Sequence, residues 1–153
     1  TSGQWYQSGM AYMAQVGALD TNQDYGYPEA AVTRGETYKM ICLGLRLTDD
    51  TSLRLSQYAA VLRSHGYEAP EGTVTGNILR WEFCQLFNDI LGRSDYALID
   101  TNNNEVTHET YNYTDLDPSE PYYKTMLIAT STFKGGKVDL VNRMDRNDYD
   151  YNK

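Results

Sequence analysis

The chain has 153 residues, of which 41% are hydrophobic, and its 13 basic and 21 acidic side chains give a formal net charge of −8. This length suits one compact domain, or a few small units that share a core. The acidic balance argues against a nucleic-acid partner or an anionic membrane surface over most of the chain, and no apolar run approaches the roughly 20 residues that would cross a bilayer.

The first predicted helix lies within residues 5–19. Apolar side chains recur there at helical spacing, and Gly17 stands where helices commonly stop. Four of these side chains are expected to face inward: Met10, Met13, Val16 and Leu19. The stretch DTNQDYGYPEAA that follows is typical of a loop.

A second helix is predicted to open at Thr33. Thr33 and Glu36 are three residues apart, a spacing that predicts a capping box in which hydroxyl and carboxylate each accept a bond from a backbone N–H. The expected buried stripe of this helix is Met40, Ile41 and Leu45.

Two further helices are predicted, over residues 53–67 and 78–93. The first is expected to bury Leu55, Tyr58, Ala59 and Leu62 and to end at His65-Gly66. The second is expected to bury Leu86, Phe87, Ile90 and Leu91 and to stop near Gly92.

The helix openings VTRGE and ILRWE indicate an internal repeat, 46 positions apart. Aligning Arg34 with Arg80 also aligns Glu36 with Glu82 and places apolar residues opposite apolar residues farther along. A repeat of this length is typical of a helix-loop-helix unit that cannot bury its apolar face alone.

The remaining chain departs from this pattern. Residues 96–112 predict a small hairpin or a long loop. A further helix is expected within residues 113–133, with Pro121 in its first turn and Met126, Leu127 and Ala129 facing inward.

Two cysteines, Cys42 and Cys84, lie in apolar helical runs without a CxxC motif, so we expect two buried free thiols. Tyrosine is abundant, at 14 residues, which suits sugar-binding surfaces and wet interfaces but also a plain polar surface. No signal peptide and no initiator methionine is present, and we expect the chain to be a piece of a larger exported polypeptide.

The sequence resembles the S-layer homology repeats that anchor bacterial surface proteins to the cell wall. The phrase VTRGE is similar to the family's Ile-Thr-Arg-Ala-Glu helix opening, and YTDLDPSEPYY is similar to its repeat opening. Trp5 and Tyr123 each lie twelve residues before a glycine, as the family's helix-opening aromatic does. The resemblance covers most of residues 5–135, apart from the insert.

The resemblance implies an all-α fold of three helix-loop-helix units in a pseudo-threefold arrangement. The expected organisation is one compact unit made of repeat 1 (1–52), repeat 2 (53–95), an insert (96–112), and a degenerate repeat 3 with a C-terminal tail (113–153). It also implies an extracellular, non-catalytic module that binds an anionic, often pyruvylated, cell-wall polysaccharide, without a cofactor, a metal or membrane insertion.

The expected ligand-binding residues are Arg34, Trp5, Tyr122, Arg80 and Trp81. An arginine at a helix start can present its planar fork to a carboxylate, and free N–H groups of the first turn would help. Thr33, Glu36 and Glu82 are expected to be structural capping residues. Because Leu79 replaces a capping Thr and Trp81 a small residue, we expect Arg34 to contribute more binding than Arg80.

Two other classes of function compete with this interpretation. One is a protein–protein interaction module, either a lattice contact or a dockerin-like calcium module. The stretch DTNQDYG spaces Asp20, Asn22 and Asp24 like calcium ligands, but Tyr25 and Ala31 stand where the signature needs Gly and Glu.

The other competing class is an enzyme. A glycosidase would need a pair of carboxylates, and nothing in the sequence singles one out. His65 and His108 are isolated, and no nucleophile or phosphate-loop motif occurs. We therefore expect no catalytic activity.

Overall fold

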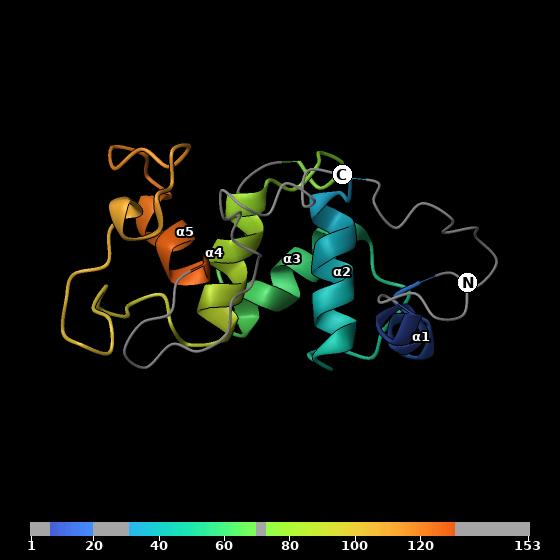
Figure 1. Cartoon of the computed structure of the whole chain (residues 1–153). Helices are drawn as coiled ribbons and strands as arrows, with labels where there is room; N and C mark the ends of the chain where they lie inside the picture. The colour runs from blue at the N-terminus through green and yellow to red at the C-terminus, as the bar shows by residue number, and fades with distance from the viewer. Residues whose placement is uncertain (1–6, 20–30, 70–72, 131–153) are drawn as a thin grey trace. The chain divides into compact units, whose positions relative to one another are not determined.

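The computed structural model describes residues 7–19, 31–69 and 73–130, and over these residues the chain is all-α, as expected, with no strand (Figure 1). None of the helices described is long and apolar enough to cross a membrane. The helices are α1 (Gln7–Gln15), α2 (Arg34–Gly44), α3 (Leu55–Ser64), α4 (Arg80–Ile90) and α5 (Tyr123–Thr130), with a 3₁₀ turn η1 (His108–Tyr111).

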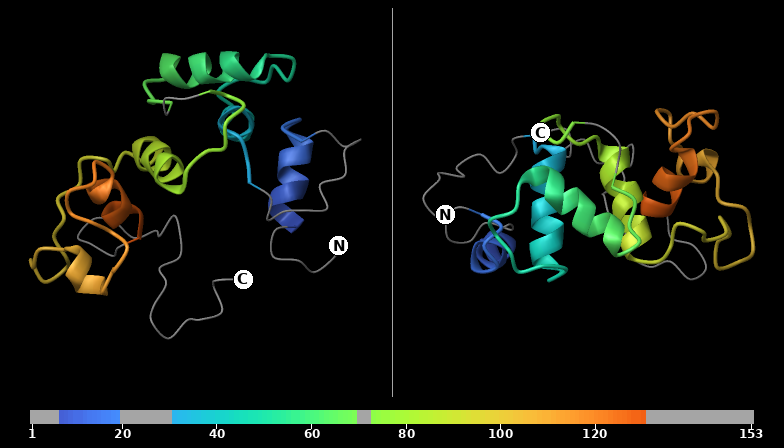
Figure 2. Two further views of the ribbon diagram at one scale, coloured as in Figure 1. Left: turned by 90° about the horizontal axis from the view of Figure 1, so that it is seen from above. Right: turned by 180° about the vertical axis from the view of Figure 1, so that it is seen from behind.

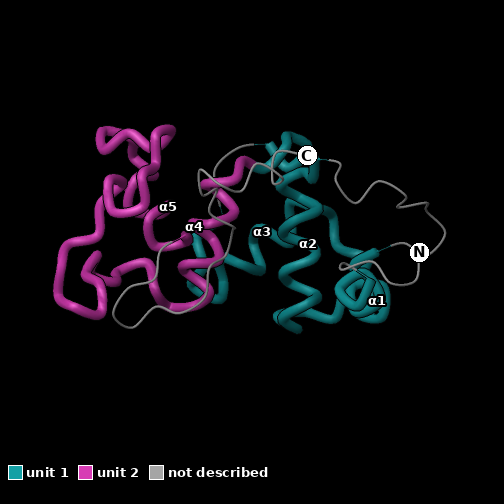
Figure 3. The backbone as a smooth tube through the Cα atoms, viewed as in Figure 1, with its two compact units in different colours: residues 1–78 teal, residues 79–153 magenta. Residues whose placement is uncertain are grey.

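The chain divides into two compact units (Figure 3), residues 1–78 and residues 79–153. Unit 1 contains α1, α2 and α3, and unit 2 contains α4, η1 and α5. The boundary between the units lies inside the second predicted repeat, directly before α4. The division of the chain into three repeats stays a prediction.

The core of unit 1 lies between α2 and α3, and α3 lies across α2 (Figure 2). Of the inward face predicted for α3, Tyr58, Ala59 and Leu62 are at most 4% exposed, as predicted, whereas Leu55 is half-buried. On α2, Ile41 is buried as predicted and Met40 is half-buried. The other large side chains that α2 buries are Tyr38, Cys42 and Leu43.

Helix α1 contacts α2 without burying any residue of its own. The Tyr12 hydroxyl donates to the Gly44 carbonyl at 2.6 Å. A Cβ added at Gly44 would lie 3.2 Å from the terminal methyl of Met13, so the missing side chain allows α1 to approach. The residues predicted to face inward (Met10, Met13, Val16 and Leu19) are half-buried.

The core of unit 2 lies between α4 and α5. Leu86, Leu127 and Ala129 are fully buried, as predicted. Other predicted inward positions are only half-buried: Phe87, Ile90 and Met126.

The insert contributes to the core of unit 2. One antiparallel bridge joins Ile99 to Glu105, and the Val106 N–H donates to the Leu98 carbonyl at 2.9 Å, so a hairpin-like loop forms without a strand. Val106 packs with Ile128 of α5, and both are 1% exposed. The insert therefore covers one face of α5.

Leu45 and Leu91 were predicted to be buried, and both predictions are wrong. They are 47% and 50% exposed. Each is the residue that ends its helix, α2 or α4. Helical spacing no longer describes where a side chain points once the backbone leaves the helix.

Helices α2 and α4 end in the same hydrogen-bond pattern, 46 positions apart. Leu47 N–H donates to the Cys42 carbonyl, and Arg93 N–H donates to the Asn88 carbonyl, each at 2.8 Å. This is a Schellman motif. The residue before each donor has a positive φ, 55° at Arg46 and 67° at Gly92. The repeat that the sequence predicts for α2 and α4 therefore includes the backbone conformation at the ends of these helices.

Helices α1 and α3 end in the same way. Gly17 after α1 and Gly66 after α3 have φ values of 78° and 83°. The next N–H in each case, from Ala18 and Tyr67, donates to a carbonyl five residues earlier, at 2.9 and 3.0 Å. The three stops predicted at glycine, at Gly17, Gly66 and Gly92, are confirmed, and Arg46 is the exception among these four helix ends.

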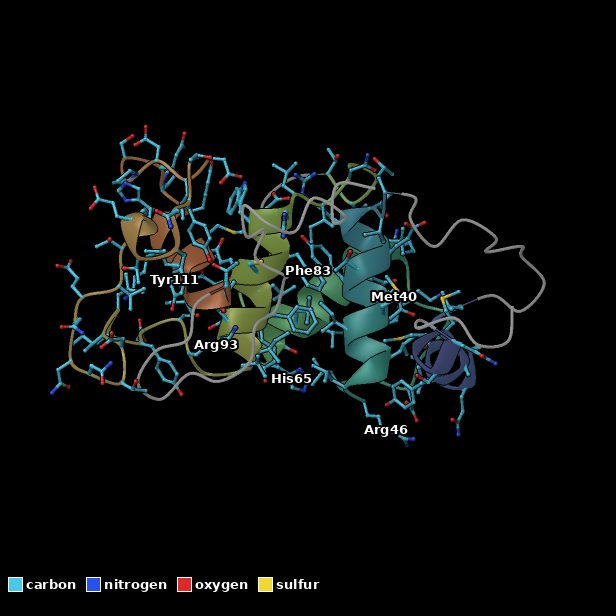
Figure 4. The ribbon with its side chains drawn as sticks, in the orientation of Figure 1. Met40, Arg46, His65, Phe83, Arg93 and Tyr111 are labelled. Carbon is cyan, nitrogen blue, oxygen red and sulfur yellow. The ribbon has the colours of Figure 1, made fainter. Side chains whose placement is uncertain are left out.

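Replacing Arg46 with glycine is expected to stabilise unit 1 by about 0.5–1 kcal/mol, because a side chain disfavours the left-handed backbone. Its own side chain points away from α2 into solvent (Figure 4), so little packing is lost. The mirror substitution, Gly92→Ala, is expected to cost about 1 kcal/mol, since a Cβ there meets nothing within 4 Å and only backbone strain is added. Urea unfolding followed by circular dichroism measures both, and a stabilised Gly92→Ala variant would contradict the argument.

The turns before α3 and α5 are also alike. Asp50 accepts hydrogen bonds from the N–H and the hydroxyl of Ser52, at 2.9 and 2.6 Å. Asp117 accepts the same pair from Ser119, at 2.8 and 2.7 Å. Such Asp-x-Ser turns satisfy backbone groups ahead of a helix. In each turn the hydrogen bonds from serine lower the pKa of the aspartate carboxyl.

Candidate functional site

Helix α2 begins with the capping box that the sequence predicts. The Thr33 hydroxyl accepts from the Glu36 N–H at 3.2 Å, and the Glu36 carboxylate accepts from the Thr33 N–H at 3.0 Å. The Thr33 carbonyl accepts the Thr37 N–H at 3.0 Å. The structural role expected for Thr33 and Glu36 is confirmed.

The N–H groups that we expected to be free at the start of α2 are occupied, which corrects that expectation. Arg34 N–H donates to the Gly76 carbonyl at 2.9 Å, and Gly35 N–H donates to the Val74 carbonyl at 2.8 Å. Sequence spacing cannot predict that a loop about 40 residues away supplies these acceptors. Both amides are already used in these bonds, so neither is left to bind an anion.

The Arg34 side chain lies against the same loop. A Cβ built at Gly76 would be 2.7 Å from the Nη1 atom of Arg34, so the guanidinium lies over the glycine. Arg34 is half-buried. It is held against its own unit rather than displayed to solvent.

Helix α4 begins with half of a capping box. The Glu82 carboxylate accepts from the Leu79 N–H at 2.7 Å, which confirms its capping role. Leu79 has no side-chain acceptor to complete the box and is 50% exposed. Glu82 is 3% exposed, so the carboxylate that caps α4 is buried.

Trp81 and Tyr122 form an aromatic stack in unit 2. Their ring centroids are 5.6 Å apart and their planes differ by 16°. Trp81 is the second residue of α4, and Tyr122 directly precedes α5. The starts of the two helices therefore meet at this pair, and both rings are half-buried.

Two cationic residues lie in the same two helix starts. Arg80 opens α4, Lys124 is the second residue of α5, and both are exposed. The positive ends of both helix dipoles add to their charge. We call Arg80, Trp81, Tyr122 and Lys124 the α4–α5 junction.

The structure brings together only part of the predicted site. Trp81 and Tyr122 are in contact, and Arg80 belongs to the same junction. Arg34 lies in unit 1. Trp5 lies outside the described residues, as do the calcium-like positions Asp20, Asn22 and Asp24.

A buried polar network joins α4 to α5, and the sequence analysis missed it. The Asn88 side-chain amide donates to the Thr125 carbonyl at 3.1 Å, and its oxygen accepts from Arg93 Nε at 3.0 Å. Asn88 and Arg93 are 2% and 4% exposed. When the two repeats are aligned, Asn88 and Arg93 match Cys42 and Leu47 of unit 1. This replacement of an apolar pair by a polar pair is the sequence signal from which the network could have been predicted.

His108 contacts the first residue of α5. The Tyr123 hydroxyl accepts the His108 backbone N–H at 3.0 Å and lies 3.1 Å from Nδ1 of the ring. Among the described residues, no three His, Cys, Asp or Glu side chains gather in a way that could hold a metal ion. The contacts of His108 with Tyr123 hold the insert beside α5.

Cys42 and Cys84 are buried free thiols, as predicted. Burial raises the pKa of each thiol to about 11, although the positive charges of Arg80 and Arg93 lower that of Cys84. The neutral thiol is therefore the form that the fold favours. Burial of the neutral thiols therefore leaves the folded state fully stable below the unfolded pKa of about 8.5. This stability is lost as the pH rises toward 11, because deprotonation then favours the unfolded chain.

Thiol labelling is expected to report unfolding. At pH 8 a pKa of about 11 leaves the thiolate fraction roughly 200-fold below that of an unfolded cysteine, and burial slows access further. Alkylation by iodoacetamide, followed by mass spectrometry, should thus be at least that much slower in the native protein than in urea. Labelling of either cysteine at the unfolded rate under native conditions would contradict this.

No protein-family model, no curated protein and no solved structure matches this chain. A functional proposal for this chain therefore depends on the residues at the starts of α4 and α5.

Proposed function

We propose that this chain is a non-catalytic anchoring module that binds an anionic polysaccharide of the bacterial cell wall through the α4–α5 junction. The observation that carries the proposal is the Trp81–Tyr122 stack, with Arg80 and Lys124 in the same two helix starts. An aromatic face suits the apolar face of a sugar ring. The cations suit a carboxylate such as a pyruvate ketal.

This arrangement addresses the problem set by the net charge of −8. An anionic ligand approaches against the field of the whole protein, so local positive charge must capture it. Residues 94–123 contain no lysine or arginine, which leaves Arg80 and Lys124 as the cations closest in sequence to the aromatic pair. A ligand would be directed to the junction rather than to the insert.

The repeated helix ends support the resemblance to S-layer homology repeats. We propose that the parent protein is exported and that its helix-loop-helix units have the pseudo-threefold arrangement typical of that family. One such module would bind the wall weakly, and several together would bind by avidity.

Co-sedimentation with purified bacterial cell walls tests the proposal. The full chain should pellet with walls that retain their secondary polysaccharide and stay in solution with walls that have been chemically stripped of it. Trp81→Ala should reduce the bound fraction, and Trp81→Phe, which keeps an aromatic ring, should retain most of it. Circular dichroism verifies that each variant is folded.

Two results would overturn the proposal. Equal binding to intact and stripped walls would remove the polysaccharide as the ligand. No binding by the folded wild type would favour the protein–protein interaction module instead.

A further inference from the structure

The start of α2 is closed from within the chain. Residues 73–77, which we call the strap, lie along the segment that enters α2. Thr33 pairs with Asn77 in an antiparallel bridge, and the Ile78 N–H donates to the Val32 carbonyl at 3.0 Å. Val32 and Ile78 are equivalent positions of the repeat, at the first residues of VTRGE and ILRWE. The hydrogen bond between them therefore links the starts of these two sequence motifs.

The strap supplies carbonyl oxygens where an anion would need N–H donors. The first amides of a helix have no partner within the helix, and bound anions commonly use them. Here Gly76 and Val74 accept those of Arg34 and Gly35 at 2.9 and 2.8 Å. Thr33 accepts the next two, from Glu36 and Thr37.

Two glycines make this close approach possible. A Cβ at Gly35 would lie 2.7 Å from Leu55 Cβ and 2.9 Å from the Val74 carbonyl oxygen. Both distances are shorter than real Cβ contacts, and the second involves backbone that cannot simply rotate away. A Cβ at Gly76 would meet the Arg34 guanidinium, at 2.7 Å.

We infer that the strap acts as an internal occupant that closes the start of α2 to ligands, so that unit 1 has no sugar site there. Arg34 then holds the strap rather than a ligand. The inference rests on the proposed function and deepens it, because within the described part of the chain it leaves the α4–α5 junction as the sugar site. It also assigns Gly35 as the residue that keeps the first site closed.

Amide hydrogen exchange tests the closure without any ligand. In the wild type, the Arg34 and Gly35 amides should exchange at rates close to those of Glu36 and Thr37. In the double variant Gly35→Ala/Leu55→Gly, the α3 side has room because both the Leu55 Cβ and its branch are removed, but the Val74 oxygen still clashes, so these amides should exchange at least about tenfold faster. Gly9→Ala is the matched control, because a Cβ there meets nothing within 4 Å.

Isothermal titration tests the consequence for binding. The probe is a short oligosaccharide that ends in a pyruvate-ketal sugar. The wild type and Gly9→Ala should bind one equivalent, and the double variant should bind two.

The outcomes separate this inference from the proposed function. Two equivalents bound by the wild type would overturn the inference alone, and so would a single equivalent bound by a double variant whose Arg34 and Gly35 amides exchange fast. No binding by the wild type would overturn the proposed function. Fast exchange of those two amides in the wild type would overturn the closure itself, whatever the ligand does.

Discussion

Replacing Asn88 with alanine is expected to destabilise unit 2 by about 3 kcal/mol. The substitution removes the acceptor of Arg93 Nε and the donor to the Thr125 carbonyl. Breaking a buried polar network on one side costs more than the bonds are worth, because the groups that remain stay desolvated. The free energy of unfolding from urea titration measures the loss.

Unit 1 provides the matched control for this prediction. Its equivalent pair, Cys42 and Leu47, is apolar and closes α2 with the same backbone pattern. The double variant Asn88→Cys/Arg93→Leu removes both polar partners together, so it should lose less stability than Asn88→Ala alone. A larger loss in the double variant would mean that Arg93 contributes mainly through contacts other than Asn88.

The helices and their caps were predictable because they depend on neighbours in sequence. Thr33 and Glu36 satisfy each other across three residues, and Gly66 and Gly92 adopt a backbone that other residues avoid. The buried face of α3 also followed from its spacing. Local rules of this kind do not require knowledge of what the helix packs against.

The predictions failed where burial or hydrogen bonding depends on distant residues, or on the point at which the backbone leaves the helix. Leu45 and Leu91 are apolar at helical spacing, yet each ends its helix and is exposed. The strap reaches α2 from about 40 residues away, so VTRGE alone could not predict the occupied amides of Arg34 and Gly35, although its Gly35 is the residue that allows the close approach. Of the residues predicted for the site, Trp81 and Tyr122 are in contact, and their stacking depends on how α4 meets α5.

The same features change which arginine should bind the ligand. The sequence ranks Arg34 above Arg80, since Thr33 completes its cap and Trp81 looks like a disturbance. In the structure the completed cap belongs to a closed helix start, with Arg34 half-buried over Gly76. The incomplete cap belongs to α4, where Arg80 is exposed and the indole of Trp81 stacks on Tyr122.

Arg80→Ala is therefore expected to weaken binding to polysaccharide-bearing walls by about 10- to 100-fold, the equivalent of about 1.4 to 3 kcal/mol for a charge-assisted contact with a carboxylate. Arg34→Ala should change the affinity less than threefold while lowering the stability of unit 1. Arg63→Ala, which removes an exposed arginine from the last turn of α3, controls for the general effect of net charge. Affinities from wall co-sedimentation at two salt concentrations, with urea unfolding alongside, separate the three. If Arg34→Ala abolished binding in a protein of unchanged stability, the ligand would lie at α2, and the strap would have to open to admit it.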